Sequence, residues 1–366
     1  MEIVHLILGK ANPERMNGVN KVVNQLVSEQ VNYGLNAEVW GISSSLEHNY
    51  PERNYKTRIF AKRRNPFLFS KELKQEVLKN RNAVYHFHGG WIPVFSSLAA
   101  FMKKNEIRYI ITPHGAYNSV AMEKSKLTKR LYYQLFEKKM IEGSKNVHSL
   151  GRSEAEALTS LSQKVKSVLI PTGFNRIENK SIEYKNSNFI VGFVGRIDVK
   201  TKGLDLMVDA FAKFQAKHPK SELWIIGEGL NTAMLKERIA FHEIQNVRFL
   251  GARFGKQKFD LMQRMDVFVH SSRNEGLPTA VLEACSLGIP VLVSPETNLG
   301  EYVSRYNAGV SLTENTVEQQ SDALELLHAK WMGKEIGSYK IGAEYMVEKV
   351  FSWKRLMREY SEMYAS

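Results

Sequence analysis

Two glutamates, Glu275 and Glu283, stand at the ends of the segment Glu-Gly-Leu-Pro-Thr-Ala-Val-Leu-Glu. Pro278 favours the first turn of a helix, so the pattern predicts that a helix begins between the two carboxylates. The first backbone N–H groups of a helix lack intrahelical partners and can hold a phosphate. The candidate phosphate-binding residues are Gly276, Leu277, Pro278 and Thr279. The two carboxylates could then bind hydroxyls on either side of a diphosphate, which is the layout of a nucleotide sugar.

Two cations follow an apolar run earlier in the chain. Residues 189–195 read as a strand, Leu204 opens a segment of helical spacing, and Arg196 and Lys202 lie in the loop between them. The carboxyl ends of parallel strands form the edge at which open α/β sheets bind ligands. Fixed cations at that edge would stabilise the charge that develops on a leaving phosphate.

The elements that position these residues alternate between strand and helix along the chain. This alternation predicts an α/β protein with mainly parallel sheets. A chain of 366 residues exceeds what one core normally serves, so two domains are expected. The boundary is predicted in residues 170–188, a Pro/Gly turn followed by a polar run. The domains are then residues 1–175 and 189–345, with a final helix in 346–366.

The segment Asn-Glu-Gly-Leu-Pro-Thr-Ala-Val-Leu-Glu-Ala-Cys-Ser-Leu-Gly-Ile-Pro-Val resembles the signature of the retaining glycosyltransferases of family 4. The loop with Arg196 and Lys202 is similar to the family's Gly-Arg…Lys-Gly element. The resemblance implies the GT-B fold, with two Rossmann-like domains facing across a cleft. It implies that residues 1–175 bind the acceptor, residues 189–345 bind the donor, and the last helix crosses back to the first domain.

The resemblance also implies an activity and a set of contacts. The expected reaction moves a hexose from a nucleotide diphosphate sugar, with UDP-sugars favoured, to a saccharide or lipid-linked saccharide. Such a reaction would serve the synthesis of cell-surface polysaccharide or lipopolysaccharide. Glu275 would bind hydroxyls of the donor sugar and Glu283 the ribose, while the chain from Gly251 to Phe254 would lie near the base. Arg196 and Lys202 would hold the diphosphate.

The amino-terminal half supplies further candidates. His114 stands in Thr-Pro-His-Gly after an apolar strand, and the resemblance places it beside the transferred sugar. Tyr117 and Asn118, next along, are candidates for the acceptor side. Asn17 and Gly18 occupy a loop where the family usually has two glycines that approach the donor. Asn tolerates left-handed backbone angles better than most residues, so the loop is retained with one glycine.

A metal is not expected at this site. The chain has no Asp-x-Asp pair, and residues 1–180 contain no aspartate, whereas Mg²⁺ prefers carboxylate and phosphate oxygens. His86 and His88 can lie on one face of a strand, but no third ligand with recognisable spacing follows. We therefore expect these two histidines to line the interdomain cleft at the end of a strand. No cofactor is predicted.

The charge is concentrated in the first half. Residues 1–180 hold 28 lysines and arginines against 15 glutamates, whereas residues 181–366 hold 23 residues of each sign. The basic residues gather at 56–64 and 124–145. Lys126, Lys129 and Arg130 would share one side of a helix, beside a stripe of Leu127, Leu131 and Leu135. This combination indicates attachment to an anionic membrane surface.

The expected location is the cytoplasm, at the inner face of the cell membrane. The opening apolar run is soon interrupted by Lys10 and Pro13, so it does not read as a signal peptide, and no transmembrane segment is present. The single cysteine, Cys285, cannot form an internal disulfide.

Several alternatives stay open at the level of sequence. The basic residues could form an ordinary solvated face, but no nucleic-acid-binding motif accompanies them, so nucleic acid is not an expected partner. The motif glutamates could be solvated acids of an ordinary α/β domain. The enzyme could instead be a GT-B-like nucleotide-sugar epimerase or hydrolase, or the chain a non-catalytic module that binds a sugar nucleotide or glycan.

Overall fold

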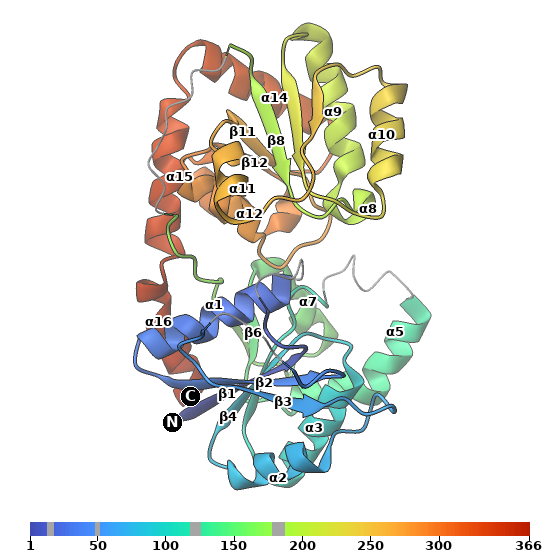
Figure 1. The fold of residues 1–366 in the computed structure, drawn as a ribbon, viewed down its shortest axis with the longest axis vertical. Helices are drawn as coiled ribbons and strands as arrows, with labels where there is room; N and C mark the ends of the chain where they lie inside the picture. The colour runs from blue at the N-terminus through green and yellow to red at the C-terminus, as the bar shows by residue number, and fades with distance from the viewer. Residues whose placement is uncertain (13–17, 48–51, 118–125, 178–186) are drawn as a thin grey trace. The chain divides into compact units, whose positions relative to one another are not determined.

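The computed structural model describes residues 1–12, 18–47, 52–117, 126–177 and 187–366, apart from the side chain of Lys126. The chain divides into two compact units. Unit 1 comprises Met1–Gly173 and Trp353–Ser366, and unit 2 comprises Phe174–Ser352. In Figure 1 each unit shows a central sheet with helices on its faces. The predicted cleft between the units stays a prediction.

The described part of unit 1 holds a seven-stranded parallel sheet in the order β3-β2-β1-β4-β5-β6-β7. Its strands are β1 (Glu2–Leu8), β2 (Asn36–Ser43), β3 (Thr57–Ala61), β4 (Val84–His88), β5 (Tyr109–Thr112), β6 (Val147–Ser149) and β7 (Ser167–Leu169). Its helices are α1 (Gly18–Asn32), α2 (Lys71–Lys79), α3 (Pro93–Lys104), α5 (Lys126–Tyr132), the π-helix η1 (Tyr133–Glu137), α6 (Lys138–Glu142), α7 (Arg152–Leu161) and α16 (Trp353–Ala365).

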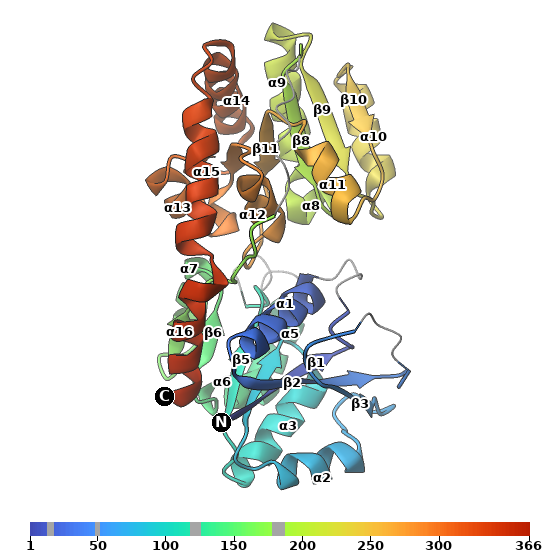
Figure 2. The same ribbon diagram turned by 60° about the vertical axis from the view of Figure 1, so that its left-hand side comes forward.

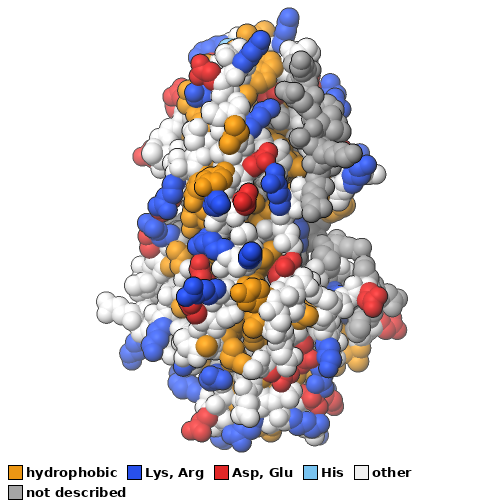
Figure 3. Space-filling view, turned by 90° about the vertical axis from the view of Figure 1, so that its left-hand side faces the viewer, with side chains coloured by type: hydrophobic (Ala, Val, Ile, Leu, Met, Phe, Trp, Pro, Cys, Tyr) orange, Lys and Arg blue, Asp and Glu red, His pale blue; other side chains and the backbone are white. Residues whose placement is uncertain are grey.

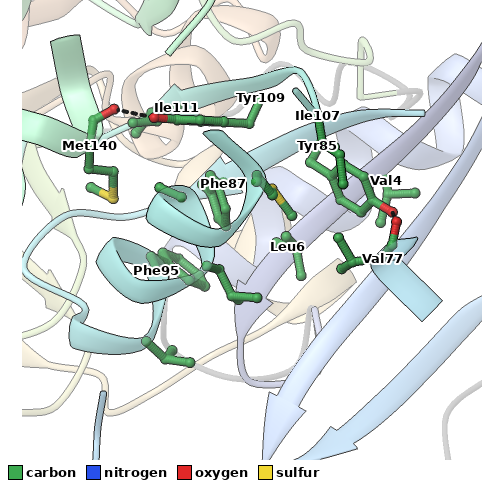
Figure 4. Close-up of a cluster of buried hydrophobic side chains, with 14 of the residues drawn as sticks. Val4, Leu6, Val77, Tyr85, Phe87, Phe95, Ile107, Tyr109, Ile111 and Met140 are labelled. Atoms are coloured by element: carbon green, nitrogen blue, oxygen red, sulfur yellow. Dashed lines mark hydrogen bonds between the residues drawn. The ribbon is translucent and has the colours of Figure 1, made fainter. Parts of the chain in front are cut away.

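The sheet of unit 1 separates two apolar clusters. Figure 4 shows part of the first, in which Leu6 and Phe87 of neighbouring strands lie near Phe95 of α3. Two buried tyrosines satisfy their hydroxyls at its edges: Tyr109 donates to the carbonyl of Met140 at 2.8 Å, and Tyr85 to that of Val77 at 3.4 Å. Burial of this apolar surface is the main favourable term for the unit, at roughly 25 cal/mol per Å².

The second cluster depends on the last helix of the chain. The sequence predicts one helix from Met346 onward, and this prediction is wrong: α15 ends at Val350 and α16 begins at Trp353. The break coincides with the boundary at which the chain returns to unit 1. The apolar side of α16, with Leu356 and Tyr360, packs into the cluster that also contains residues of α1. Figures 1 and 2 both show α16 next to α1.

The described part of unit 2 holds a six-stranded parallel sheet in the order β10-β9-β8-β11-β12-β13. Its strands are β8 (Ile190–Val194), β9 (Glu222–Ile226), β10 (Val247–Phe249), β11 (Val267–His270), β12 (Val291–Val293) and β13 (Gly309–Ser311). Its helices are α8 (Val199–Lys202), α9 (Leu204–Lys217), α10 (Thr232–Phe241), α11 (Gly255–Met262), α12 (Thr279–Ser286), the 3₁₀-helix η2 (Pro295–Thr297), α13 (Gly300–Arg305), α14 (Val317–Met332) and α15 (Gly337–Val350).

Unit 2 has the strand and helix alternation that the sequence predicts. The strands β8, β9, β11 and β12 are wholly buried, which explains their continuous apolar runs. Helices α9 and α14 pack together over the apolar cluster of this unit. The α/β class with two parallel sheets is therefore confirmed.

The surface and the helices bear on the predicted membrane contact. On the face drawn in Figure 3, basic and acidic side chains are interspersed with hydrophobic ones, so no field of one sign stands out there. Among the residues that the structure describes, no helix has both the length and the apolar character required to cross a bilayer.

Candidate active site

The motif residues of unit 2 meet at one edge of its sheet. Strands β8 and β11 are neighbours, and both run parallel, so the loops that follow them leave from the same edge. Arg196 and Lys202 come from the chain after β8, and Glu275 comes from the chain after β11. The ammonium of Lys202 forms an ion pair with the carboxylate of Glu275. Residues 73 positions apart in the sequence thus form one site.

Glu275 is held by its own loop as well as by the lysine. The Nε2 of His270 and the Oγ of Ser272 each lie 3.1 Å from Glu275 Oε1. The side-chain amide of Asn298 donates to the carbonyls of Glu275 and Gly276 at 3.2 and 2.9 Å. These contacts fix a carboxylate whose side chain is only 15% exposed. The sequence motifs did not indicate His270, Ser272 or Asn298, because none has a distinctive spacing.

The charges of this cluster support an ionised carboxylate. Burial alone would raise the pKa of Glu275, but the Lys202 ammonium and the hydrogen bond from His270 outweigh it and lower the pKa to about 2. Burial lowers the pKa of His270, which therefore stays neutral and can donate a hydrogen bond to Glu275 through Nε2. The site contains a permanent ion pair in a half-enclosed setting, where electrostatic interactions are stronger than in bulk water.

Lys202 stands on a helical turn rather than in an open loop. It is the last residue of α8, whose start is capped by Asp198 through a bond from the Thr201 amide at 3.1 Å. Gly203 follows with φ of +62°, and a Cβ there would lie 2.0 Å from the carbonyl oxygen of Ser271. Only glycine allows the turn after β8 to approach the chain after β11 this closely. The Lys-Gly part of the motif is therefore a requirement of packing as well as of charge.

Arg196 has a different setting. Its side chain is 60% exposed, and its guanidinium lies 3.9 Å from the carboxylate of Asp198. Exposed ion pairs at such distances contribute little to stability. The arginine can therefore turn toward a bound anion at small cost.

Helix α12 begins where the sequence predicts. Pro278 is its N-cap residue, Thr279 is its first residue, and no side chain of the N-cap bonds to its first amides. Leu277, beside the proline, is 8% exposed. The eight-residue helix thus presents an N-terminus of the kind that binds phosphate.

The second motif glutamate is paired with a cation. The Glu283 side chain is 4% exposed, and the Lys258 ammonium lies 2.6 Å from its Oε2. Lys258 belongs to α11, whose N-cap residue Phe254 is 60% exposed. No sequence motif indicated Lys258, because its partner is 25 residues away and lies on another helix. The role of Glu283 in binding a ribose stays a prediction.

His114 belongs to unit 1, at the end of β5. It has φ of +55°, and the following Gly115 has φ of +80°, so the chain makes a left-handed turn after Pro113. The carboxylate of Glu154, on α7, accepts hydrogen bonds from the backbone amides of Gly115 and Leu150. Burial raises the pKa of Glu154 to about 7. This buried glutamate holds the His114 turn, and sequence motifs did not point to it.

The structure corrects one candidate on the acceptor side. Tyr117 is fully buried in the first apolar cluster, and its hydroxyl donates to the carboxylate of Glu137. A side chain in that position cannot contact an acceptor. Gly18 is the first residue of α1, and a Cβ there would meet no other described residue within 4 Å. Asn17 and Asn118 lie outside the described residues.

The structure also corrects the prediction for the histidines of β4. His86 and His88 are buried at 0% and 2% exposure, so they do not line a cleft. A third histidine, His5 of β1, lies opposite His86 in the parallel register. The ring nitrogens of these three histidines come within 4.8 Å of one another, although His5 precedes the pair by about 80 residues. The sequence analysis considered only ligands that follow the pair, whereas His5 precedes it and joins it through the strand register.

Comparison with known families agrees with this geometry. Residues 174–337 match the model described as "Glycosyl transferases group 1", and residues 16–176 match that of "Glycosyltransferase Family 4". The chain belongs to the group 1, family 4 glycosyltransferases. The junction of the two matches falls within three residues of the boundary between units 1 and 2. The resemblance drawn from the motif segments is confirmed.

Individual relatives of this glycosyltransferase point the same way. It is 25% identical to the capsular polysaccharide biosynthesis glycosyltransferase CapM of Staphylococcus aureus. The matched 191 residues cover 52% of this chain and 49% of CapM. It is 31% identical over 149 residues to the O-antigen biosynthesis glycosyltransferase WbnH of Escherichia coli, over 41% of this chain and 40% of that protein. The chain spans about half the length of the curated relatives it matches.

A solved structure covers the whole glycosyltransferase. The Anabaena protein HepE, in complex with UDP-glucose, superposes with a TM-score of 0.74 at 15% identity, over 100% of this chain and 99% of HepE. A likeness of this extent confirms the GT-B fold class.

Proposed function

We propose that this glycosyltransferase moves a hexose from a nucleoside diphosphate sugar to a hydroxyl of a saccharide or lipid-linked saccharide, with retention at the anomeric carbon. The observation that carries the proposal is the cluster at the sheet edge of unit 2. There Lys202, Arg196 and the N-terminus of α12 offer positive charge and N–H groups, and Glu275 offers a fixed carboxylate. A diphosphate flanked by sugar hydroxyls matches this set of donors and acceptors.

The ion pair between Lys202 and Glu275 supports a division of roles on donor binding. In the described structure the two charges neutralise each other. An incoming diphosphate would draw the ammonium toward its oxygens, and hexose hydroxyls could then donate hydrogen bonds to the Glu275 carboxylate. The depressed pKa of Glu275 keeps the carboxylate ready as an acceptor at neutral pH. UDP is the favoured nucleotide, which the complex of HepE with UDP-glucose supports by analogy of fold alone.

The proposed step breaks the bond between the anomeric carbon and the phosphate oxygen and forms a bond to the acceptor oxygen on the same face of the sugar. The proton of the acceptor hydroxyl passes to the leaving phosphate, so the atoms and charges balance. Arg196 and Lys202 stabilise the negative charge that grows on that phosphate. No protein nucleophile is used. The products are the glycosylated acceptor and a nucleoside diphosphate, and the synthesis of a capsule or O-antigen polysaccharide is the proposed setting.

Nucleotide binding provides the direct test. Isothermal titration calorimetry of the full chain with UDP, GDP and their sugars is expected to show binding, tightest for a UDP ligand. Binding is expected to persist in excess EDTA, because the diphosphate is held by protein cations. Absence of heat with every nucleotide, or loss of binding in EDTA, contradicts the proposed site. Mass analysis of products with and without an acceptor separates transfer from epimerisation and hydrolysis.

We further propose that unit 1 attaches to an anionic membrane surface. Leu127, Leu131 and Leu135 are 82%, 63% and 53% exposed along α5 and η1. The ring of Phe67 lies 4.7 Å from that of Phe136, which brings the segment with Lys62, Arg63, Arg64 and Leu68 beside these helices. We call this surface the basic-apolar patch. Each well-placed cation near an anionic bilayer is worth about 1 kcal/mol.

Flotation with vesicles tests the basic-apolar patch. The chain is expected to float with phosphatidylglycerol vesicles at low salt and to stay behind with phosphatidylcholine vesicles or at high salt, because the attraction is screened. The double variant Arg63→Glu with Arg64→Glu is expected to lose flotation. The control Lys220→Glu with Lys340→Glu changes the charge equally on exposed sites of unit 2 and should float normally. Equal flotation of the two double variants excludes the patch.

A further inference from the structure

Unit 1 contains a buried chain of hydrogen bonds that leads to His114. Its members come from β1, β4, β5 and β6, from the segments that follow β5 and β7, and from α1 and α16, which pack on one face of the sheet. The members, in order, are Ile170, His148, Thr112, His86, Tyr364, Gln30, His5, His88 and His114. Distances between successive polar atoms are 2.6 to 3.1 Å. Only the last member, His114, is a candidate for contact with the transferred sugar; the other members have no role in the proposed reaction.

The direction of the chain is fixed at one end by a backbone carbonyl. The Ile170 oxygen can only accept, so the Nε2 of His148, 2.7 Å away, must carry the proton. In a neutral ring the Nδ1 of His148 is then an acceptor, and the Thr112 hydroxyl donates to it at 2.7 Å. Thr112 has a single hydroxyl proton, so its oxygen accepts from the Nε2 of His86 at 2.6 Å.

The donor and acceptor roles of the next links, through α16 and α1, follow in turn. With its Nε2 protonated, His86 accepts at Nδ1 from the Tyr364 hydroxyl at 2.7 Å. Tyr364 therefore accepts from the Gln30 amide nitrogen at 3.1 Å, which leaves the Gln30 oxygen to accept from the Nε2 of His5 at 2.7 Å. The orientation of the Gln30 amide is thus set by the carbonyl of Ile170.

The final links reach the turn after β5. His5 accepts at Nδ1 from the Nε2 of His88 at 2.8 Å, and His88 accepts at Nδ1 from the Nε2 of His114 at 3.0 Å. His114 consequently has its proton on Nε2 and a lone pair on Nδ1. Among the residues that the structure describes, no protein group bonds to that Nδ1, and the His114 side chain is only partly buried.

This arrangement of protons requires neutral imidazole rings, and burial keeps the rings neutral. Burial lowers the pKa of His5 and of His148 to about 4 and that of His114 to about 3. It also lowers the pKa of His86 and of His88 well below the usual value. A charged ring would carry protons on both nitrogens and would interrupt the chain.

The alternative role for His5, His86 and His88 is to bind a metal ion. Zn²⁺ could use three imidazoles, as it does in other proteins. Here, however, both nitrogens of all three rings already face protein partners, and the three side chains are 0 to 2% exposed. A metal would have to displace several of these bonds and would leave buried groups unpaired, at a cost for each. The hydrogen-bond chain accounts for all six nitrogens.

We propose that this chain of hydrogen bonds is a positioning device that holds His114 with a bare Nδ1, so that the ring accepts a hydrogen bond from a hydroxyl of the donor hexose. The inference rests on the proposed function for the identity of the ligand, whereas the arrangement of protons does not depend on it. The other members of the hydrogen-bond chain, which touch no ligand, thereby make His114 Nδ1 an acceptor. It can bind a ligand group that donates a hydrogen bond, such as a hydroxyl, but not a group that only accepts. Tyr364, on the last helix, is the member farthest from His114 in sequence.

Nuclear magnetic resonance of the full chain with ¹⁵N-labelled histidine tests the arrangement without any substrate. The five histidines of the hydrogen-bond chain are expected to show a slowly exchanging proton on Nε2 and none on Nδ1. None of these rings is expected to take up a second proton between pH 6 and 8. The reverse direction would place the proton on Nδ1 in all five rings. A proton on Nδ1 in any of them, or a shift of the His5, His86 and His88 signals on adding Zn²⁺, overturns the proposal.

Two conservative variants of α16 test the link to function. Tyr364→Phe removes the hydroxyl between Gln30 and His86. The control is Tyr360→Phe, because Tyr360 is similarly buried and its hydroxyl lies outside the hydrogen-bond chain, 3.5 Å from the carbonyl of Pro171. Only Tyr364→Phe is expected to give mixed tautomers in His5, His88 and His114. It should raise the KM for the sugar donor about three- to tenfold, the effect of one lost hydrogen bond, and leave the Kd of the nucleoside diphosphate unchanged.

The tautomer measurement and the nucleotide-binding measurement together distinguish failure of the proposed device from failure of the proposed function. If Tyr364→Phe keeps a single tautomer in all five rings, or if Tyr360→Phe disturbs them equally, the proposed device is wrong. If the tautomers change as expected while no nucleotide binds to the wild-type chain, the proposed function fails and the proton arrangement stands.

Discussion

Arg196→Ala is expected to lower kcat about 10²- to 10³-fold, the usual cost of removing one group that stabilises developing charge. The fold should be unaffected, because the Arg196 side chain is 60% exposed and its ion pair with Asp198 spans 3.9 Å. The loss should fall on turnover more than on donor KM, since the arginine acts on charge that grows as the leaving phosphate departs. Steady-state kinetics and thermal unfolding of the same preparation measure both effects.

A matched arginine elsewhere in unit 2 controls for charge. The Arg305 side chain is 62% exposed, pairs with Glu301 at 2.9 Å on α13 and belongs to neither sequence motif. Arg305→Ala should retain wild-type kcat and a similar melting temperature. Transfer rates in Arg196→Ala equal to those in Arg305→Ala would remove Arg196 from the mechanism.

The stability of the protein is expected to fall as the pH decreases from about 6.5 toward 4.5. The pKa values of five histidines in unit 1 are lower in the folded chain than the ordinary value of 6.5. These are His5, His86, His88, His114 and His148. Below pH 6.5 the unfolded chain binds protons that the folded chain cannot, so each histidine removes up to about 1.4 kcal/mol per pH unit.

Two buried glutamates act in the opposite direction. Burial raises the pKa of Glu137 and of Glu154 to about 7, so the folded chain holds their protons between about pH 4.5 and 7. They favour folding as the pH falls through that window. The five histidines outnumber them, and the expected net result is a loss of several kcal/mol by pH 4.5.

Chemical denaturation at a series of pH values measures this dependence. His148→Asn is expected to flatten it, because the asparagine oxygen can accept from Thr112 without titrating. His242→Gln, at an exposed position of unit 2, should leave the dependence unchanged. Constant or rising stability between pH 6.5 and 4.5 would mean that the glutamates dominate or that the histidines are charged in the fold.

Local patterns in the sequence were sufficient for much of unit 2. The apolar strand, the cations and Gly203 occur within 15 residues, and the two motif glutamates lie eight positions apart. Short spacings of this kind translate directly into a strand end and a helix start, so β8 and α12 could be predicted closely. The proposed roles of Arg196 and Lys202 rest on these predictions.

Contacts between distant segments could not be predicted in the same way. Lys258 meets Glu283 across two helices, Glu154 reaches back to Gly115, and His5 joins His86 through strand register. The prediction for Tyr117 was wrong because its place near His114 in the sequence does not determine the direction of its side chain, which enters the core. Such relationships depend on which strands become neighbours, and an order such as β2-β1-β4 is not written in any one segment.

The return of α16 to unit 1 has a consequence for synthesis on the ribosome. Trp353, Leu356 and Tyr360 cover apolar residues of β1 and α1, which are translated long before them. These two elements of the nascent polypeptide therefore wait, with one face uncovered, until α16 has emerged. Exposed apolar surface of this kind favours aggregation and recruits chaperones. Unit 2, whose residues form one continuous stretch, can complete its fold before unit 1 does.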